Sequence, residues 1–237
     1  MVIFKGIIII TMSRDYKKFS PECFYHIYNR GVNKMNIFID EQDKKVFLSR
    51  LKENLFPELG MNLGKINKLN STKIHTPYVR KVLPANSFSL VAYCIMPNHF
   101  HFLIKQNKEI SISKLVGKIT TSYSKYFNLK YKRVGAIFQD QFKAIHVDDN
   151  TYLLWLSEYI HLNPVVAGLV KFAENWKWSS YQEFLNKNKD NLCEKSIILD
   201  QFKNIESYKQ ATIDFLKSIQ TKKFSEIEMT YAEFESP

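Results

Sequence analysis

The segment Leu90-Val-Ala-Tyr-Cys-Ile-Met-Pro-Asn-His-Phe-His-Phe-Leu-Ile-Lys105 consists of two apolar runs separated by Met96-Pro97-Asn98. Proline and asparagine are favoured in tight turns, so the segment predicts a β-hairpin. His99 and His101 lie two residues apart at the start of the second run, and alternate residues of a strand point to the same face. The pair therefore predicts two neighbouring imidazoles on one rigid surface, which is half of a metal site.

The sequence around this hairpin predicts an α+β fold, in which a small antiparallel sheet packs against helices. Alternating apolar residues indicate strands, and apolar residues at helical spacing indicate helices. Asp40 can cap the first helix, Asp148 or Asp149 can cap the third, and Pro164 is expected to end the third. The expected strands cover 24–28, 87–95, 100–106 and 136–147, and the expected helices cover 41–55, 111–129, 151–162 and 205–219.

The composition favours a globular protein that meets a polyanion. The 237 residues are 45% hydrophobic and carry a net charge of +11, a balance for which nucleic acid is the first partner to consider. A solvated, lysine-rich surface is the alternative. The three cysteines form no disulfide framework or metal motif, so the sequence predicts a reducing, cytoplasmic setting.

The chain divides by composition into three expected parts. Residues 1–19 form an N-terminal extension, in which we expect Met12 to be the natural start. The apolar stretch over 4–11 is too short to span a bilayer. Residues 20–184 form the main domain, with a polar loop insertion at about 57–86. Residues 185–237 form a helical and flexible tail, for which a docking helix and a DNA-contacting arm are both open.

A second polar cluster, Glu158-Tyr-Ile-His-Leu-Asn-Pro164, lies on the third expected helix. Tyr159 and Asn163 are four residues apart, so both project from one face and could meet the two imidazoles. A divalent cation held by three neutral ligands keeps its charge and open positions for phosphate oxygens. The Tyr159 hydroxyl could then act as a nucleophile. A buried or interfacial aromatic residue is the alternative for Tyr159, and a structural role is the alternative for the histidines.

Six segments, taken in order, resemble the single-tyrosine HUH transposases, and within them the REP-associated tyrosine transposase (IS200-like) type. The resemblance covers roughly residues 24 to 184, and it depends on the ordered combination of the segments. They are Tyr25-His-Ile-Tyr-Asn-Arg-Gly31, Tyr93-Cys-Ile-Met-Pro-Asn-His-Phe-His-Phe-Leu-Ile104, Tyr123-Ser-Lys-Tyr-Phe-Asn128, Gly135-Ala-Ile-Phe-Gln-Asp-Gln-Phe-Lys-Ala144, Tyr159-Ile-His-Leu-Asn-Pro-Val165 and Trp176-Lys-Trp-Ser-Ser-Tyr181.

The resemblance implies a role for each site residue. His99 and His101 would bind a divalent metal, Mg²⁺ or Mn²⁺, with Asn163 as the third ligand, although relatives often carry glutamine at that position. Tyr159 would attack single-stranded DNA, leaving a 5′-phosphotyrosine and a free 3′-hydroxyl. The fold would be the ferredoxin-like HUH fold. The partner would be hairpin-bearing single strands with REP-like or element-end sequences, bound by a monomer or a homodimer.

Several other side chains allow two interpretations. Tyr123 and Tyr126 are competing nucleophiles but fit a packing stripe better. His161 is expected on the helix flank or at DNA, and His26 is expected to be structural. Phe138 could stack on unpaired bases, although burial is the better expectation. The residues expected to bind the DNA backbone are Arg30, Lys114, Lys118, Lys125, Lys132, Arg133 and Lys143, and Lys130 belongs to the same basic surface.

Two rival functions stay open on the sequence. The first is a non-catalytic, domesticated protein that binds hairpin nucleic acid. The second is a metal-dependent nuclease that uses water, in which Tyr159 is only structural. The presence of both histidines, the tyrosine and the amide favours the strand-transfer enzyme over these rivals.

Overall fold

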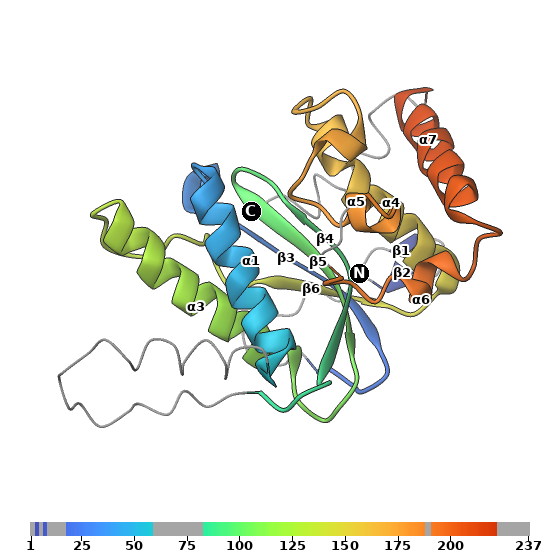
Figure 1. The fold of residues 1–237 in the computed structure, drawn as a ribbon. Helices are drawn as coiled ribbons and strands as arrows, with labels where there is room; N and C mark the ends of the chain where they lie inside the picture. Colours follow the sequence, from blue (N-terminus) through green and yellow to red (C-terminus); the bar gives the residue numbers. More distant parts are fainter. Residues whose placement is uncertain (1–2, 5–6, 9–17, 59–82, 188–190, 222–237) are drawn as a thin grey trace.

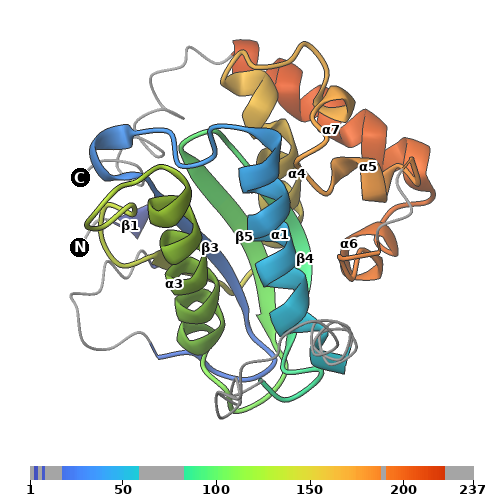
Figure 2. The same ribbon diagram turned by 60° about the vertical axis from the view of Figure 1, so that its left-hand side comes forward.

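The computed structural model describes residues 3–4, 7–8, 18–58, 83–187 and 191–221. Its centre is a four-stranded antiparallel sheet with helices on both faces (Figures 1 and 2). The strands run in the order β4 (Phe88–Ile95), β5 (His99–Gln106), β3 (Phe24–Arg30) and β6 (Lys143–Val147). The short strands β1 (Ile3–Phe4) and β2 (Ile7–Ile8) pair with each other apart from this sheet. The predicted α+β class is confirmed.

The predicted hairpin is formed by β4 and β5, joined through Met96-Pro97-Asn98. The Met96 N–H donates to the His99 carbonyl at 2.9 Å and closes the turn. Because side chains alternate along a strand, β5 presents Phe100 and Phe102 on one face of the sheet and the two histidines on the other.

Helices α1 (Glu41–Leu55) and α3 (Ile112–Lys130) cover the phenylalanine face. The ring of Phe47 on α1 lies 5.0 Å from that of Phe100 and 5.9 Å from that of Phe102. Tyr123 on α3 packs edge-on against Phe47 at 5.0 Å. All four side chains are fully buried, so the aromatic residues of this face form the packed core.

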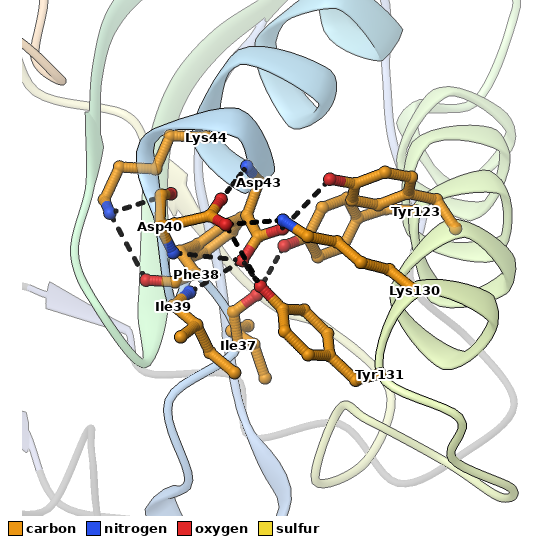
Figure 3. Close-up of polar contacts among 10 residues, drawn as sticks. Ile37, Phe38, Ile39, Asp40, Asp43, Lys44, Tyr123, Lys130 and Tyr131 are labelled. Atoms are coloured by element: carbon orange, nitrogen blue, oxygen red, sulfur yellow. Dashed lines mark hydrogen bonds and ion pairs between the residues drawn. The ribbon is translucent and has the colours of Figure 1, made fainter.

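A polar network joins the start of α1 to the end of α3 (Figure 3). Asp40 caps α1, and Asp43 completes a capping box. The buried Asp43 carboxylate also accepts hydrogen bonds from the Tyr126 and Tyr131 hydroxyls at 3.0 and 2.8 Å, and it pairs with Lys130 at 2.7 Å. The network therefore supplies partners to polar groups that would otherwise be costly to bury.

Helix α4 (Asn150–Val166) lies on the histidine face, and α7 (Ile205–Thr221) packs on its outer side. Asp149 caps α4 by accepting from the Tyr152 N–H at 2.8 Å. The expectation that Pro164 ends this helix is wrong. Proline removes one helical hydrogen bond, but the Ala167 N–H still reaches the Asn163 carbonyl at 2.9 Å. The chain turns away only at Gly168, whose φ is +68°.

The expected strand over 136–147 is shorter in the structure, where β6 begins at Lys143. Upstream, Phe138 forms an isolated bridge with Gly31, and Gln139 hydrogen-bonds to the end of β3. Gly31 is required here because a Cβ atom would lie 2.2 Å from the Met35 carbonyl oxygen.

Short helices complete the described chain: η1 (Val32–Lys34), η3 (Ala173–Asn175), α5 (Tyr181–Phe184) and α6 (Ser196–Leu199). Residues 59–82 of the expected insertion, the tail beyond 221 and most of the N-terminal extension lie outside the described residues. Within the part that is described, no helix is long and apolar enough to cross a membrane. All three cysteines are unpaired.

Candidate metal and nucleophile site

The two imidazoles of β5 lie side by side beneath α4. Their ring centroids are 4.9 Å apart and the rings are nearly perpendicular, at 89°. His101 is buried with 2% of its surface exposed, and His99 is partly exposed at the end of the strand. The strand geometry expected from the His-x-His spacing is therefore present.

Each imidazole is held through its Nδ1 atom. The Nδ1 of His99 lies 2.6 Å from Oδ1 of Asn98, and the Asn98 amide is oriented because its Nδ2 donates to the Lys34 carbonyl at 3.2 Å. Since a carbonyl oxygen only accepts, His99 carries its proton on Nδ1. The Nδ1 of His101 lies 2.9 Å from Nε2 of His26 on β3. Both histidines thus present Nε2 to the space below α4.

The environment of the Nε2 atom of His99 shows whether these residues fit a metal ion. It is buried and has no hydrogen-bond partner among the described residues. Buried nitrogens are rarely left unpaired in proteins, because the lost hydrogen bond to water is not replaced. An unprotonated, buried Nε2 beside a second imidazole has the chemistry of a metal ligand. The residues present therefore fit a divalent cation.

Asn163 completes a set of three neutral donors. It is buried on α4, and its amide lies 3.4 Å from Nε2 of His101. The nearer atom is assigned as nitrogen, and rotation of the amide by half a turn would exchange it for the oxygen that a metal requires. No cluster of three or more His, Cys, Asp and Glu side chains is placed to hold a metal in the described chain. The donor set here is instead two imidazoles and an amide.

Tyr159 lies one helical turn before Asn163, on the same face of α4. Its ring centroid is 5.9 Å from that of His101, with the rings at 87°. On its other side, Trp155 stacks against it almost parallel, at 5.7 Å and 3°. Phe215 of α7 packs on Trp155 in turn, at 5.4 Å. The tyrosine that the sequence singled out is thus placed beside the imidazoles by contacts from both sides.

Burial keeps the histidines neutral. It lowers the pKa of His99 to about 4, an effect that the nearby Asn163 amide opposes and the Arg30 charge reinforces. Burial also lowers the pKa of His101 well below its usual value, with the neighbouring His99 and His26 acting in the same direction. The pKa of His26 falls to about 3 through burial. Neutral imidazoles have a free lone pair, which metal binding requires.

The turn that carries His99 is fixed by the segment after β3. The Pro97 carbonyl accepts hydrogen bonds from the Ile37 and Phe38 N–H groups at 3.0 and 2.9 Å. The Asn98 carbonyl accepts from the Gly31 N–H at 2.7 Å. The α1 capping network begins at the next residues, so the turn and the packed face support each other.

Two of the residues predicted to contact DNA lie on the site's side of the sheet. Arg30 is the cross-strand partner of His99, and its Nε donates to the Gln139 side chain at 2.6 Å. Lys143 is exposed at the start of β6, opposite Tyr28. The strand register therefore places both cations on the same face of the sheet as the imidazoles.

The other predicted DNA contacts lie elsewhere. Lys114, Lys118 and Lys125 are on α3, which covers the opposite face of the sheet. Lys132 and Arg133 follow α3. The structure therefore does not gather the seven residues on one surface, and their contact with DNA stays a prediction. Lys130 is engaged within the protein by ion pairs of 2.7 Å to Asp40 and Asp43.

Burial decides between the alternative roles predicted for His161, Tyr123 and Phe138. His161 is buried, with Nδ1 2.8 Å from the Tyr208 hydroxyl and Nε2 2.7 Å from that of Ser180. It is therefore neither on the helix surface nor a DNA contact. Tyr123 is buried across the sheet and donates to the Ile37 carbonyl. Phe138 is also buried.

His26 is the site residue whose position the sequence did not reveal.

The comparison with known families decides the classification. Residues 20–163, more than half of the chain, match the model described as "Transposase IS200 like". The chain belongs to this family. The resemblance inferred from the six segments is thereby confirmed.

One relative in sequence supports the classification, and one solved structure supports the fold. A Haemophilus influenzae protein described as a REP-associated tyrosine transposase is 33% identical over 105 residues, covering 40% of this chain and 59% of that protein. The chain thus aligns with little more than half of that relative. A REP-associated tyrosine transposase solved bound to a REP hairpin superimposes with a TM-score of 0.52 at 15% identity, over 74% of this chain and 87% of the other. At that identity the match supports the fold.

Proposed function

We propose that the chain is a strand-transfer enzyme that cuts and rejoins single-stranded DNA, with Tyr159 as the nucleophile. The observation that carries the proposal is the juxtaposition of two neutral imidazoles, an amide and a phenol under α4. The ring of Tyr159 lies 5.9 Å from that of His101, and Asn163 lies 3.4 Å from the same imidazole. Membership of the transposase family makes DNA the substrate to test first.

His99, His101 and Asn163 would hold Mg²⁺ or Mn²⁺ at this position. Because all three donors are neutral, a cation bound there would keep its charge and polarise the oxygens of a phosphate. Imidazole also accepts Zn²⁺, so the identity of the metal is part of the proposal that requires measurement.

Tyr159 would attack the scissile phosphorus through its hydroxyl oxygen. The O–P bond forms, the bond from phosphorus to the 3′ oxygen breaks, the phenolic proton passes to solvent, and the departing 3′ oxygen takes up a proton. The products are a 5′-phosphotyrosine and a 3′-hydroxyl. The phosphotyrosine preserves the energy of the broken bond, so attack by a 3′-hydroxyl can rejoin the strand.

The partner is proposed to be single-stranded DNA that folds into a hairpin with REP-like or element-end sequence. The structural neighbour with a REP hairpin supports this substrate by analogy of fold. Arg30 and Lys143, beside the site, would contact the phosphate backbone. The setting would be the cytoplasm, with the chain acting as a monomer or a homodimer.

Labelled hairpin-bearing single-stranded DNA, incubated with the protein and Mg²⁺ or Mn²⁺, tests the proposal on a denaturing gel. We expect a covalent protein–DNA band that is absent for Tyr159→Phe. Tyr152→Phe, which removes a hydroxyl from the same helix, serves as the matched control and should keep the band.

The same gel separates the two rivals. Cleavage that persists unchanged in Tyr159→Phe, without any covalent band, would favour a nuclease that uses water. Hairpin binding without cleavage under each metal would favour a non-catalytic binding protein.

A further inference from the structure

His26 is a buried polar side chain that contacts a candidate metal ligand. The proposed reaction gives it no role. It lies on β3, diagonally across from His101 on β5, because Tyr28 is the direct cross-strand partner of His101. Its Nε2 is 2.9 Å from Nδ1 of His101. The two rings are nearly parallel, at 18°, with centroids 5.1 Å apart. Only 4% of its surface is exposed.

We propose that His26 is a positioning residue, which selects the tautomer of His101 whose Nε2 can bind the metal. The inference rests on the proposed function, since it assigns a role toward the metal of that site. Two neutral imidazoles share one hydrogen bond, and the proton in it can belong to either ring. If it belongs to His101, Nδ1 of His101 donates and its Nε2 lone pair is free. If it belongs to His26, His101 carries its proton on Nε2 and cannot bind a metal there.

The acceptors around the two histidines explain why the tautomer of His101 depends on His26. His99 is held in the Nδ1-protonated form by the Asn98 oxygen, so one ligand is already fixed by an acceptor on the turn. His101 is fully enclosed, and the acceptor that can do the same for it is Nε2 of His26. Tyr28 supports the acceptor by stacking on His26 at 5.0 Å. Partners that orient a metal-bound histidine in this way typically change metal affinity about 10–100-fold when they are removed.

Two substitutions separate an acceptor role from a packing role. His26→Gln keeps an amide near the position of Nε2, and the amide oxygen can accept from Nδ1 of His101. His26→Phe keeps a ring that can stack on Tyr28 but removes the acceptor. His146→Phe is the matched control, because His146 is an exposed histidine of the adjacent strand β6, paired with Tyr25.

Mn²⁺ binding to the full-length chain, measured by the paramagnetic resonance signal of the free ion, is the first readout. We expect His26→Phe to weaken binding about 10–100-fold, and His26→Gln and His146→Phe to bind nearly as tightly as the unaltered chain. Thermal unfolding without metal, run in parallel, shows whether each variant is folded. The second readout is ¹⁵N NMR of the Mg²⁺-loaded chain, in which His101 should carry its proton on Nδ1.

Three results would overturn the inference in different ways. Equal Mn²⁺ affinity in His26→Phe and the unaltered chain would overturn the role of His26 while leaving the metal site intact. Equal weakening in His26→Gln and His26→Phe, with both folded, would show that ring packing matters and the acceptor does not. If neither the unaltered chain nor His99→Ala binds Mn²⁺, the proposed metal site itself is contradicted.

Discussion

The two faces of β5 bury different kinds of side chain, aromatic rings on one and imidazoles on the other. On the α1 and α3 side, Phe100 and Phe102 are enclosed by other aromatic rings, and the carboxylate of Asp43 accepts hydrogen bonds from several donors. On the α4 side, a buried nitrogen of His99 has no partner within the described chain. A single strand thus carries an apolar face that is packed by aromatic rings and a face whose two imidazoles form a candidate ligand site.

The difference indicates how stability and function are divided in this fold. A closely packed apolar face contributes to the free energy of folding, whereas imidazoles buried side by side lower it unless hydrogen bonds or a ligand compensate. Substitutions on the first face should therefore change stability, and substitutions on the second should change metal binding and catalysis.

The largest effect is expected from His99→Ala and His101→Ala. Each removes a proposed ligand, so Mn²⁺ affinity should fall by more than the roughly 10–100-fold that loss of an outer partner costs, and the covalent DNA band should disappear. Thermal unfolding without metal should change little for His99→Ala. If a variant loses stability but its folded fraction keeps full Mn²⁺ affinity, the role of that histidine is structural.

Phe102→Ala should have the opposite profile. The fully buried ring is lost from the packed face, so the free energy of unfolding should fall by about 3–5 kcal/mol in urea titrations. Mn²⁺ affinity of the folded protein should remain unchanged. Loss of metal binding at full stability would contradict the division between the faces.

Asp43→Asn should lower stability by about 2 kcal/mol, since buried donors lose a charged acceptor. Burial of Asp43 opposes ionisation, but hydrogen bonds from Lys130 and Tyr131 outweigh it, and the pKa of Asp43 is lower than its usual 3.8. A lowered pKa means that the ionised group stabilises the fold above pH 3.8 and that this contribution is lost as pH falls through the lower, folded-state pKa.

Urea unfolding at pH 7 and at pH 3 checks this expectation. The difference in stability between the unaltered chain and Asp43→Asn should be full at pH 7 and smaller at pH 3. Asp148→Asn, which removes an exposed carboxylate just before α4, is the control for the change in net charge. A difference that is equally large at both values would show that the network does not depend on ionised Asp43.

Much of the fold follows from local sequence patterns. The hairpin and the helix over 41–55 were predictable because alternation, spacing and an Asp cap act within a few residues. The meeting of Tyr159 with His101 was predictable as a hypothesis because the i, i+4 spacing places Tyr159 and Asn163 on one face.

The remaining features depend on pairings between distant segments. The contact of His26 with His101 requires the register of β3 against β5, which joins residues 75 positions apart. The position of Lys114 across the sheet follows from which face α3 covers, and charge patterning contains no information on that choice. The continuation of α4 past Pro164 depends on hydrogen bonds that the following residues still make.

The smallest effect is expected for Trp155→Leu, which removes the ring stacked on Tyr159 but leaves the proposed ligands. An aromatic pair is worth about 0.5–1.5 kcal/mol, so the initial rate of covalent band formation should fall roughly twofold to tenfold. Mn²⁺ affinity should be unaffected. An unchanged rate would show that the helix alone positions the phenol.

The proposed role of Tyr159 is tested most directly by identifying the residue that becomes attached to DNA. The covalent complex formed with hairpin-bearing single-stranded DNA is isolated, digested with trypsin and nuclease, and sequenced by mass spectrometry. We predict a nucleotide joined through its 5′-phosphate to Tyr159. A nucleotide on another tyrosine, such as Tyr152 or Tyr28, or DNA cleavage with no modified tyrosine, would contradict it.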